Sequence, residues 1–270
     1  MPNQSTLNEE VFLPSRGIIY PKEFNIQQSI VVSPFKTKDL KGLFGSNSAA
    51  AINTLIKNCI VGDFRMDCKD LHIEDRTALF TRIRAITLGS EYKTSRECSA
   101  CKKTFDVTWD LNSLECLYLD VDEYPIPITL PDCNKEIRIG VVLPQELRDA
   151  QELVEKRRQQ QVEDFDEDAE LMFYYFASMI KVIDGVIPSL QSKIEFILSC
   201  SPDDYGYLQY IDSNIKFGIN NKKTVKCPHC RTEHTALFSP TEQFFRSTHG
   251  LPKGLRVSKG VLGRNPTETV

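Results

Sequence analysis

Two stretches decide the fold of this chain: Cys98-Ser-Ala-Cys101-Lys-Lys-Thr-Phe-Asp-Val-Thr-Trp and Cys227-Pro-His-Cys230-Arg-Thr-Glu-His-Thr-Ala-Leu-Phe. Each is a Cys-x2-Cys turn that leads into residues alternating between apolar and polar, as in a half-buried strand. Two such turns can supply four thiolates to one tetrahedral zinc ion. The sequence therefore predicts one structural zinc per chain, bound by Cys98, Cys101, Cys227 and Cys230, that clamps two distant segments together.

The cysteine pairs have two alternative interpretations, as redox dithiols or as ordinary buried cysteines. A thioredoxin-like motif opens a helix after a strand, whereas both pairs here precede a strand-like run, which favours the metal. His229 and His234 are alternative ligands beside the second pair. We favour the four thiolates, because a histidine next to such a turn is more often a solvated neighbour.

The composition limits the class of protein. A chain of 270 residues with ordinary hydrophobic content can bury a core in one large or two small domains. The nine cysteines are odd in number and no secretory signal is present, which favours a reducing compartment with thiols free or metal-bound. No apolar run reaches the ~20 residues of a membrane span. A net charge of −4 argues against a protein that coats nucleic acid.

Residues 1–143 are predicted to form an N-terminal α/β region that includes the first cysteine pair. Residues 12–21 contain two prolines and a glycine, which forbid a helix and indicate a rigid extended segment. Amphipathic helices are predicted over residues 49–60 and 75–88. Arg76, Arg82 and Arg84 are predicted to form a solvated face of the second helix, which Gly89 ends. Residues 90–142 have the pattern of a sheet with a hairpin around residues 131–135.

Residues 144–217 are predicted to be a helical insertion. Pro144 fits a first helical position, and Ser201-Pro202-Asp203-Asp204 marks the start of the last helix. Residues 163–170 hold six acids, which we interpret as a solvated linker because they lack the spacing of a calcium loop. Helices are predicted over residues 171–183 and 189–199.

The remaining residues form the second cysteine pair with a short helix, 218–246, and a basic tail, 247–270. The tail carries no acid between Glu242 and Glu268 and cannot pack a core of its own, so it is either a free tail or a basic arm that orders on a partner. The predicted fold class is α+β: an N-terminal α/β part, two zinc-ribbon-like cysteine turns brought together, and a helical subdomain inserted between them.

No catalytic set is recognisable in the sequence. It contains no Gly-rich phosphate loop, no Gly-x-Ser-x-Gly elbow and no His-Glu-x-x-His. His72 and His249 stand alone, and four thiolates leave no open position on a metal. The sequence therefore predicts a protein that is not an enzyme.

Several motifs in order carry a family resemblance. They are Leu13-Pro14-Ser15-Arg16-Gly17-x-x-Tyr20-Pro21, the segment 31–39, the helix end 56–60, the helix segment 79–84, the first cysteine pair, and Phe244-Phe245-Arg246. In these the chain resembles the baseplate hub and hub-assembly proteins of contractile-tailed, T-even-like bacteriophages. The two cysteine pairs lack the glycine that commonly follows such a turn and have Lys102 and Arg231 instead.

The resemblance implies a role in tail morphogenesis without catalysis. The expected location is the virion tail baseplate or the host cytoplasm during assembly. The expected partners are other tail and baseplate hub proteins, the tape-measure protein, or a second copy of the chain, with no membrane and no nucleic acid. The residues expected to bind a partner are Leu13, Pro14, Arg16, Gly17, Tyr20, Pro21, Phe244, Phe245 and Arg246. The alternative function is a zinc-ribbon nucleic-acid-binding or transcription accessory protein, supported by the cysteine turns and the basic tail.

Overall fold

The structure, a computed structural model, describes residues 8–40, 49–160, 165–238 and 242–245. Its α-helices are α1 (Ala49–Cys59), α2 (Ile73–Leu88), α3 (Pro144–Gln159), α4 (Glu167–Met179), α5 (Leu190–Ser199) and α6 (Pro202–Asn214). Its strands are β1 (Glu9–Phe12), β2 (Ser29–Val32), β3 (Glu91–Glu97), β4 (Thr104–Asp110), β5 (Cys116–Leu117), β6 (Ile126–Thr129), β7 (Glu136–Ile139), β8 (Ile180–Ile183), β9 (Gly218–Ile219), β10 (Lys222–Lys226) and β11 (Glu233–Leu237). Short 3-10 turns are η1 (Lys22–Phe24), η2 (Thr37–Leu40), η3 (Cys68–Asp70) and η4 (Glu242–Phe245). The α+β class predicted from the sequence is confirmed.

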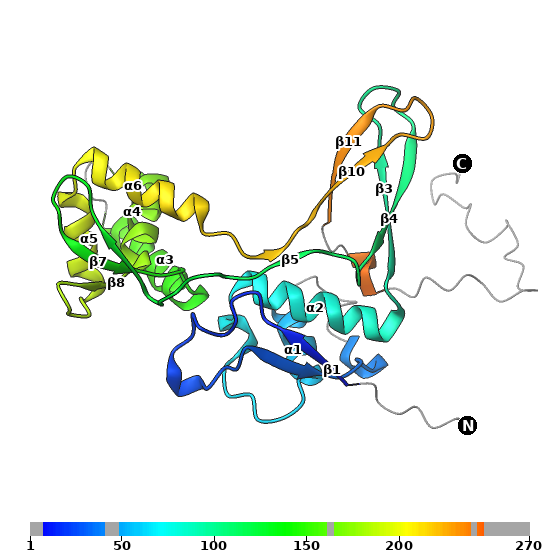
Figure 1. The fold of residues 1–270 in the computed structure, drawn as a ribbon, viewed down its shortest axis with the longest axis horizontal. Helices are drawn as coiled ribbons and strands as arrows, with labels where there is room; N and C mark the ends of the chain where they lie inside the picture. Colours follow the sequence, from blue (N-terminus) through cyan, green and yellow to red (C-terminus); the bar gives the residue numbers. More distant parts are fainter. Residues whose placement is uncertain (1–7, 41–48, 161–164, 239–241, 246–270) are drawn as a thin grey trace, which may run out of the picture.

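The N-terminal body packs α1 and α2 beside the antiparallel pair β1 and β2 (Figure 1). Leu79 and Ile83 lie one turn apart on α2, and both are fully buried, as the three/four spacing predicts. Gly89 ends the helix with φ of +90°, a conformation that glycine adopts without steric cost. The helix predicted over 75–88 is therefore confirmed, with a start two residues earlier.

One of the three arginines of α2 differs from the solvated face predicted for them, while Arg76 and Arg82 are part-exposed. Arg84 is fully buried. Its Nε donates to the Phe244 carbonyl at 3.2 Å, its Nη1 donates to the Gly89 carbonyl, and its guanidinium lies 5.7 Å from the Tyr92 ring centroid. The prediction was wrong for Arg84 because η4 and β3 cover this side of the helix, and their ring faces and carbonyls take the place of water.

Two β-hairpins rise side by side from this body (Figure 1). One is β3–β4, with pairs from Glu91↔Asp110 to Glu97↔Thr104, and the other is β10–β11, with pairs from Lys222↔Leu237 to Lys226↔Glu233. The alternation predicted for β4 is confirmed, since every second side chain along it is buried. The hairpins share one hydrophobic core with the N-terminal body.

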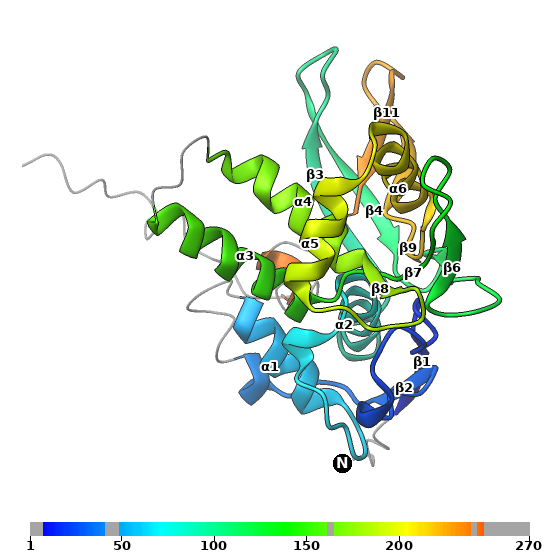
Figure 2. The ribbon, with the colours of Figure 1, turned by 90° about the vertical axis from the view of Figure 1, so that its left-hand side faces the viewer.

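The inserted unit has its own core. It joins helices α3 to α6 with a three-stranded antiparallel sheet in the order β6-β7-β8, and its core is separate from that of the N-terminal body. The four helices predicted between the cysteine pairs are present, and Figure 2 shows this unit facing the viewer. The hairpin of β6 and β7 packs with these helices, so it belongs by packing to the insertion, although the boundary predicted at residue 143 separates it from them.

The helix predicted over residues 171–183 is shifted toward the N-terminus. Helix α4 begins at Glu167 within the acidic run, and the side chain of Asp166 caps it by accepting the Ala169 N–H at 3.1 Å. Acidic side chains in a first turn are stabilised by the helix dipole, so part of the supposed linker is a helix start. Residues 180–183 leave the helix and form β8, because their β-branched side chains pair with β7.

The chain enters and leaves the insertion through a narrow two-stranded connection. β5 pairs antiparallel with β9, so segments separated by about one hundred residues run side by side (Figure 1). An ion pair between Arg148 on α3 and Asp70 in η3 also joins the two units. Among the helices in the described ranges, none combines the length and apolar character that crossing a bilayer requires.

Candidate metal centre

The two cysteine pairs meet at the tips of the hairpins. The Sγ atoms of Cys98, Cys101, Cys227 and Cys230 all lie within 4.8 Å of one another. The close contacts run between the pairs: Cys98 Sγ lies 3.6 Å from Cys230 Sγ, and Cys101 Sγ lies 3.8 Å from Cys227 Sγ. The turns predicted to converge from opposite sides of the insertion do converge.

The spacing of the sulfur atoms suits a tetrahedral metal ion. With metal–sulfur bonds of about 2.3 Å, sulfur atoms at the corners of a tetrahedron lie about 3.8 Å apart. The two closest contacts, 3.6 and 3.8 Å, match that edge, whereas a disulfide requires about 2.05 Å. Four thiols in this arrangement can hold a metal ion.

The two turns repeat the same local backbone geometry. The N–H of Lys102 donates to the Cys98 carbonyl at 2.9 Å, and the N–H of Arg231 donates to the Cys227 carbonyl at 2.8 Å. Lys102 and Arg231 have φ of +59° and +62°, the left-handed conformation that a glycine at these positions would adopt more easily. The absence of glycine in the sequence therefore does not prevent the turn from forming.

Hydrogen bonds bias the thiols toward different protonation states. The hydroxyl and backbone N–H of Thr232 lower the pKa of the Cys230 thiol to about 6. The backbone N–H of Lys103 also lowers the pKa of Cys101, but burial and the three neighbouring sulfur atoms outweigh it and raise that pKa to about 11. Because a metal binds thiolates, Cys230 offers a deprotonated ligand at neutral pH.

The N-terminal segment is tied to the start of α2 by a buried carboxylate. Asp75 is fully buried and accepts the Ser15 N–H at 2.9 Å, the Ser15 hydroxyl, and the Tyr20 hydroxyl at 2.6 Å. Gly17 has φ of +73°, and a Cβ there would lie 2.7 Å from the Gln27 carbonyl oxygen. We call Ser15, Tyr20 and Asp75 the N-terminal anchor; no motif in the sequence marks Asp75 as one of its members.

The side chains predicted to bind a partner are partly interior. Leu13 and Tyr20 are buried, while Arg16 and Pro21 are exposed. Phe244 and Phe245 are also buried, with ring centroids 5.1 and 4.6 Å from that of Phe80. Pro14 and Gly17 are buried as well, and Arg246 lies outside the described residues. Of the predicted residues that the structure describes, those in the exposed part of the N-terminal segment are the ones that a partner can reach without unfolding.

A comparison with protein-family models matches residues 18–246 to the family described as T4 bacteriophage base plate protein. The chain belongs to this baseplate family. The match spans both cysteine pairs and the whole helical insertion, so it covers the full architecture and not one motif. No curated protein and no solved structure matches the chain. Membership makes this a structural protein of the phage tail baseplate, in contact with other tail proteins.

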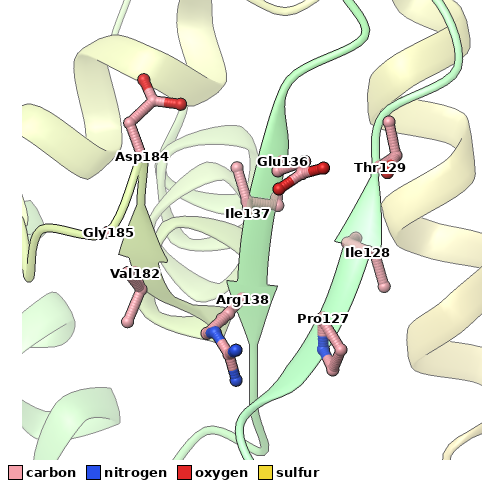
Figure 3. Close-up of a pocket in the computed structure, with 9 residues that line it drawn as sticks. All are labelled: Pro127, Ile128, Thr129, Glu136, Ile137, Arg138, Val182, Asp184 and Gly185. Carbon is pink, nitrogen blue, oxygen red and sulfur yellow. The ribbon is translucent and has the colours of Figure 1, made fainter.

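A separate hollow of the baseplate protein lies on the outer face of the β6-β7-β8 sheet (Figure 3). It encloses about 500 Å³, and its charged lining residues are Glu136, Arg138 and Asp184. Arg138 is already paired with Glu123 at 2.5 Å. Because the lining contains no cysteine or histidine, this hollow is chemically distinct from the metal centre.

The stability of the baseplate protein is expected to depend on His72, the cap of α2. Its Nδ1 accepts the Glu74 N–H at 3.3 Å. Burial, with the charge of Arg76 as a smaller cause, lowers the pKa of His72 from 6.5 to about 4. The histidine therefore contributes stability above pH 6.5 that is lost as the pH falls toward 4, by up to about 3 kcal/mol.

His72→Asn keeps a capping acceptor that does not titrate in this range. We expect urea unfolding between pH 7 and pH 4.5 to show a smaller loss of stability in this variant than in the native protein. Burial raises the pKa of Glu74 and of Asp75. These two shifts increase the stability as the pH falls, but they do so equally in the native protein and in the variant. Parallel stability curves would show that His72 does not titrate with unfolding.

Proposed function

We propose that this baseplate protein is a non-catalytic subunit or assembly factor of the hub of a contractile tail, and that one zinc ion staples its hairpins. The observation that carries the proposal is the convergence of four thiols from two hairpins in a member of a baseplate family. Four thiolates fill a tetrahedral coordination sphere, so such an ion keeps no open position for water or substrate. The metal then has a structural role, because it holds the two hairpins in a fixed arrangement.

The donor set favours zinc over harder cations. All four candidate ligands are sulfur atoms, whereas magnesium and calcium select oxygen. When bound, zinc supplies folding energy, about 10–16 kcal/mol in zinc-finger peptides. The chain itself aligns the hairpins: Arg96 donates to the Thr235 carbonyl at 2.8 Å, and Lys223 donates to the Thr108 carbonyl at 3.2 Å.

The docking face that we propose is the exposed part of the N-terminal segment. Arg16, Gly17 and Pro21 line a hollow of about 610 Å³ together with Val121 and Asp122. Arg16 lies 3.4 Å from the exposed Asp120, and such an exposed ion pair contributes little to stability, so the guanidinium can exchange it for a carboxylate of a partner.

The N-terminal anchor prepares this face for binding. Ser15 and Tyr20 hold the segment from behind through Asp75, so its backbone is ordered before a partner arrives. Preordering lowers the entropic cost of association. The proposed partners are hub subunits and the tape-measure protein, met in the host cytoplasm during assembly or in the tail baseplate.

The test is binding of purified protein to purified hub subunits and tape-measure protein of the same phage, followed by analytical size-exclusion chromatography and calorimetry. We expect a stoichiometric complex with one of them. Arg16→Glu is expected to weaken it roughly 10-fold or more, as interface arginines often do, while the exposed Arg65→Glu leaves it unchanged.

Three outcomes have distinct meanings. If none of these tail proteins binds, the hub role fails. If binding occurs but both charge reversals leave it unchanged, the docking face lies elsewhere. Salt-dependent binding to duplex DNA in place of the tail proteins would favour the zinc-ribbon nucleic-acid function instead.

A further inference from the structure

One histidine contacts the metal centre without belonging to the group of ligands. His234 lies on β11 opposite Val225, and its Nε2 is 3.2 Å from Cys98 Sγ. Its ring packs at 5.9 Å, between centroids, from that of Phe105 on β4. Strand register and ring packing together hold the imidazole against this one sulfur atom.

The geometry does not make His234 a fifth ligand. The set of mutually close donor atoms consists of the four sulfur atoms, and the imidazole nitrogen is not part of it. Those four atoms lie within 4.8 Å of one another, and four thiolates are enough to fill a tetrahedral coordination sphere. Nε2 thus approaches the outside of the cluster, at the distance of a hydrogen bond to sulfur.

We propose that His234 is a positioning residue that donates its Nε2–H to the Cys98 thiolate and so strengthens metal retention; this rests on the proposed zinc. A metal-bound thiolate has no proton, so it can only accept, and the protonated nitrogen must be Nε2. Cys98 is fully buried, so water does not reach its sulfur from outside the protein. His234 supplies the donor that water cannot.

The hydrogen bond from His234 is expected to act on the negative charge of the four thiolates and their metal ion. Four thiolates around a divalent ion carry a net charge of −2, and a donor N–H disperses part of it. Partners that bind metal ligands from outside in this way typically change metal affinity 10–100-fold when they are removed. His229, which is exposed in the turn between Cys227 and Cys230, makes no such contact with Cys98 in the described structure and provides the matched control.

Two substitutions separate the hydrogen bond from packing. His234→Phe keeps a ring beside Phe105 and removes the donor, whereas His234→Gln removes the ring and keeps an N–H donor of similar reach. Each is compared with the native protein and with His229→Phe. The measurements are zinc affinity, by competition with a chromophoric chelator, and the sulfur-to-cobalt charge-transfer band of the Co²⁺-loaded protein.

We expect His234→Phe to weaken zinc binding by about 10-fold or more and to shift the charge-transfer band, while His234→Gln stays within about 3-fold of native. Equal affinity and an unchanged band in native protein and His234→Phe would overturn the proposal. Equal losses in the Phe and Gln variants would also overturn it, because a retained N–H donor would then not preserve the affinity. If the native protein binds no zinc, the proposed metal itself fails. If instead all variants bind one zinc ion with equal affinity, the metal stands and only the proposed role of His234 fails.

Discussion

Cys98→Ser is expected to unfold both hairpins while the inserted helical unit stays folded. The serine hydroxyl is a poor zinc ligand, so we expect this variant to lose the metal. The loss lowers the free energy of unfolding by about 4 kcal/mol or more, which is the stabilisation that a ligand gives at 1,000 times its Kd. The insertion has its own core, so most of the helical circular dichroism is expected to remain.

Trp109 is a direct probe of this event. It is the single tryptophan of the chain, lies on β4, and is 2% exposed, with its ring 5.6 Å from that of Phe238 between centroids. Its emission should shift to longer wavelength in Cys98→Ser, and in the native protein on treatment with a strong chelator. Cys133→Ser, at an exposed thiol, is the control and should behave as native. Unshifted emission in Cys98→Ser, with no response to chelator, would contradict the account.

Asp75→Ala is expected to lower the free energy of unfolding by about 3–5 kcal/mol, because it leaves three buried donors without an acceptor. The donors are the backbone N–H and hydroxyl of Ser15 and the hydroxyl of Tyr20. The measurement is urea unfolding monitored by circular dichroism, with the N-terminal segment followed by limited proteolysis. We expect cleavage near residues 16–22 to accelerate in the variant.

The matched control for this prediction is Asp63→Ala. Asp63 is exposed, and its one ion pair among the described residues is with the exposed Arg65, so the expected change is within about 0.5 kcal/mol. A double-mutant cycle of Tyr20→Phe with Asp75→Ala should give a coupling energy of at least about 1 kcal/mol. Additive effects would show that the anchor does not hold the segment.

The cluster of four thiols was predictable because the pattern of each cysteine pair is local. Each cysteine pair and the alternation after it, such as Phe105, Val107 and Trp109, lie within about a dozen residues, and both runs form strands as predicted. The convergence of the pairs followed from the chemistry of zinc alone, since no local pattern reports which segments meet in space.

The N-terminal anchor was not predictable in the same way. Ser15 and Tyr20 are sixty and fifty-five residues from Asp75, and one acid in the first turn of a helix looks like any other until its burial is known. Arg84 was misjudged for the same reason, because the aromatic ring of Phe244 that covers it is one hundred and sixty residues away. Strand β8 was missed because it continues an apolar helix without a break, and only its pairing with β7 distinguishes it.

The most direct test of the central claim is the number of metal ions per chain, measured by native mass spectrometry on the intact protein, Cys98→Ser and Cys227→Ser. The account predicts one zinc ion per native chain and none in either variant, because each variant removes one of four shared ligands. Iron in place of zinc would keep the shared centre and change the metal. No metal in the native protein, or zinc retained in one of the two variants, would contradict the claim that both cysteine pairs hold a single ion.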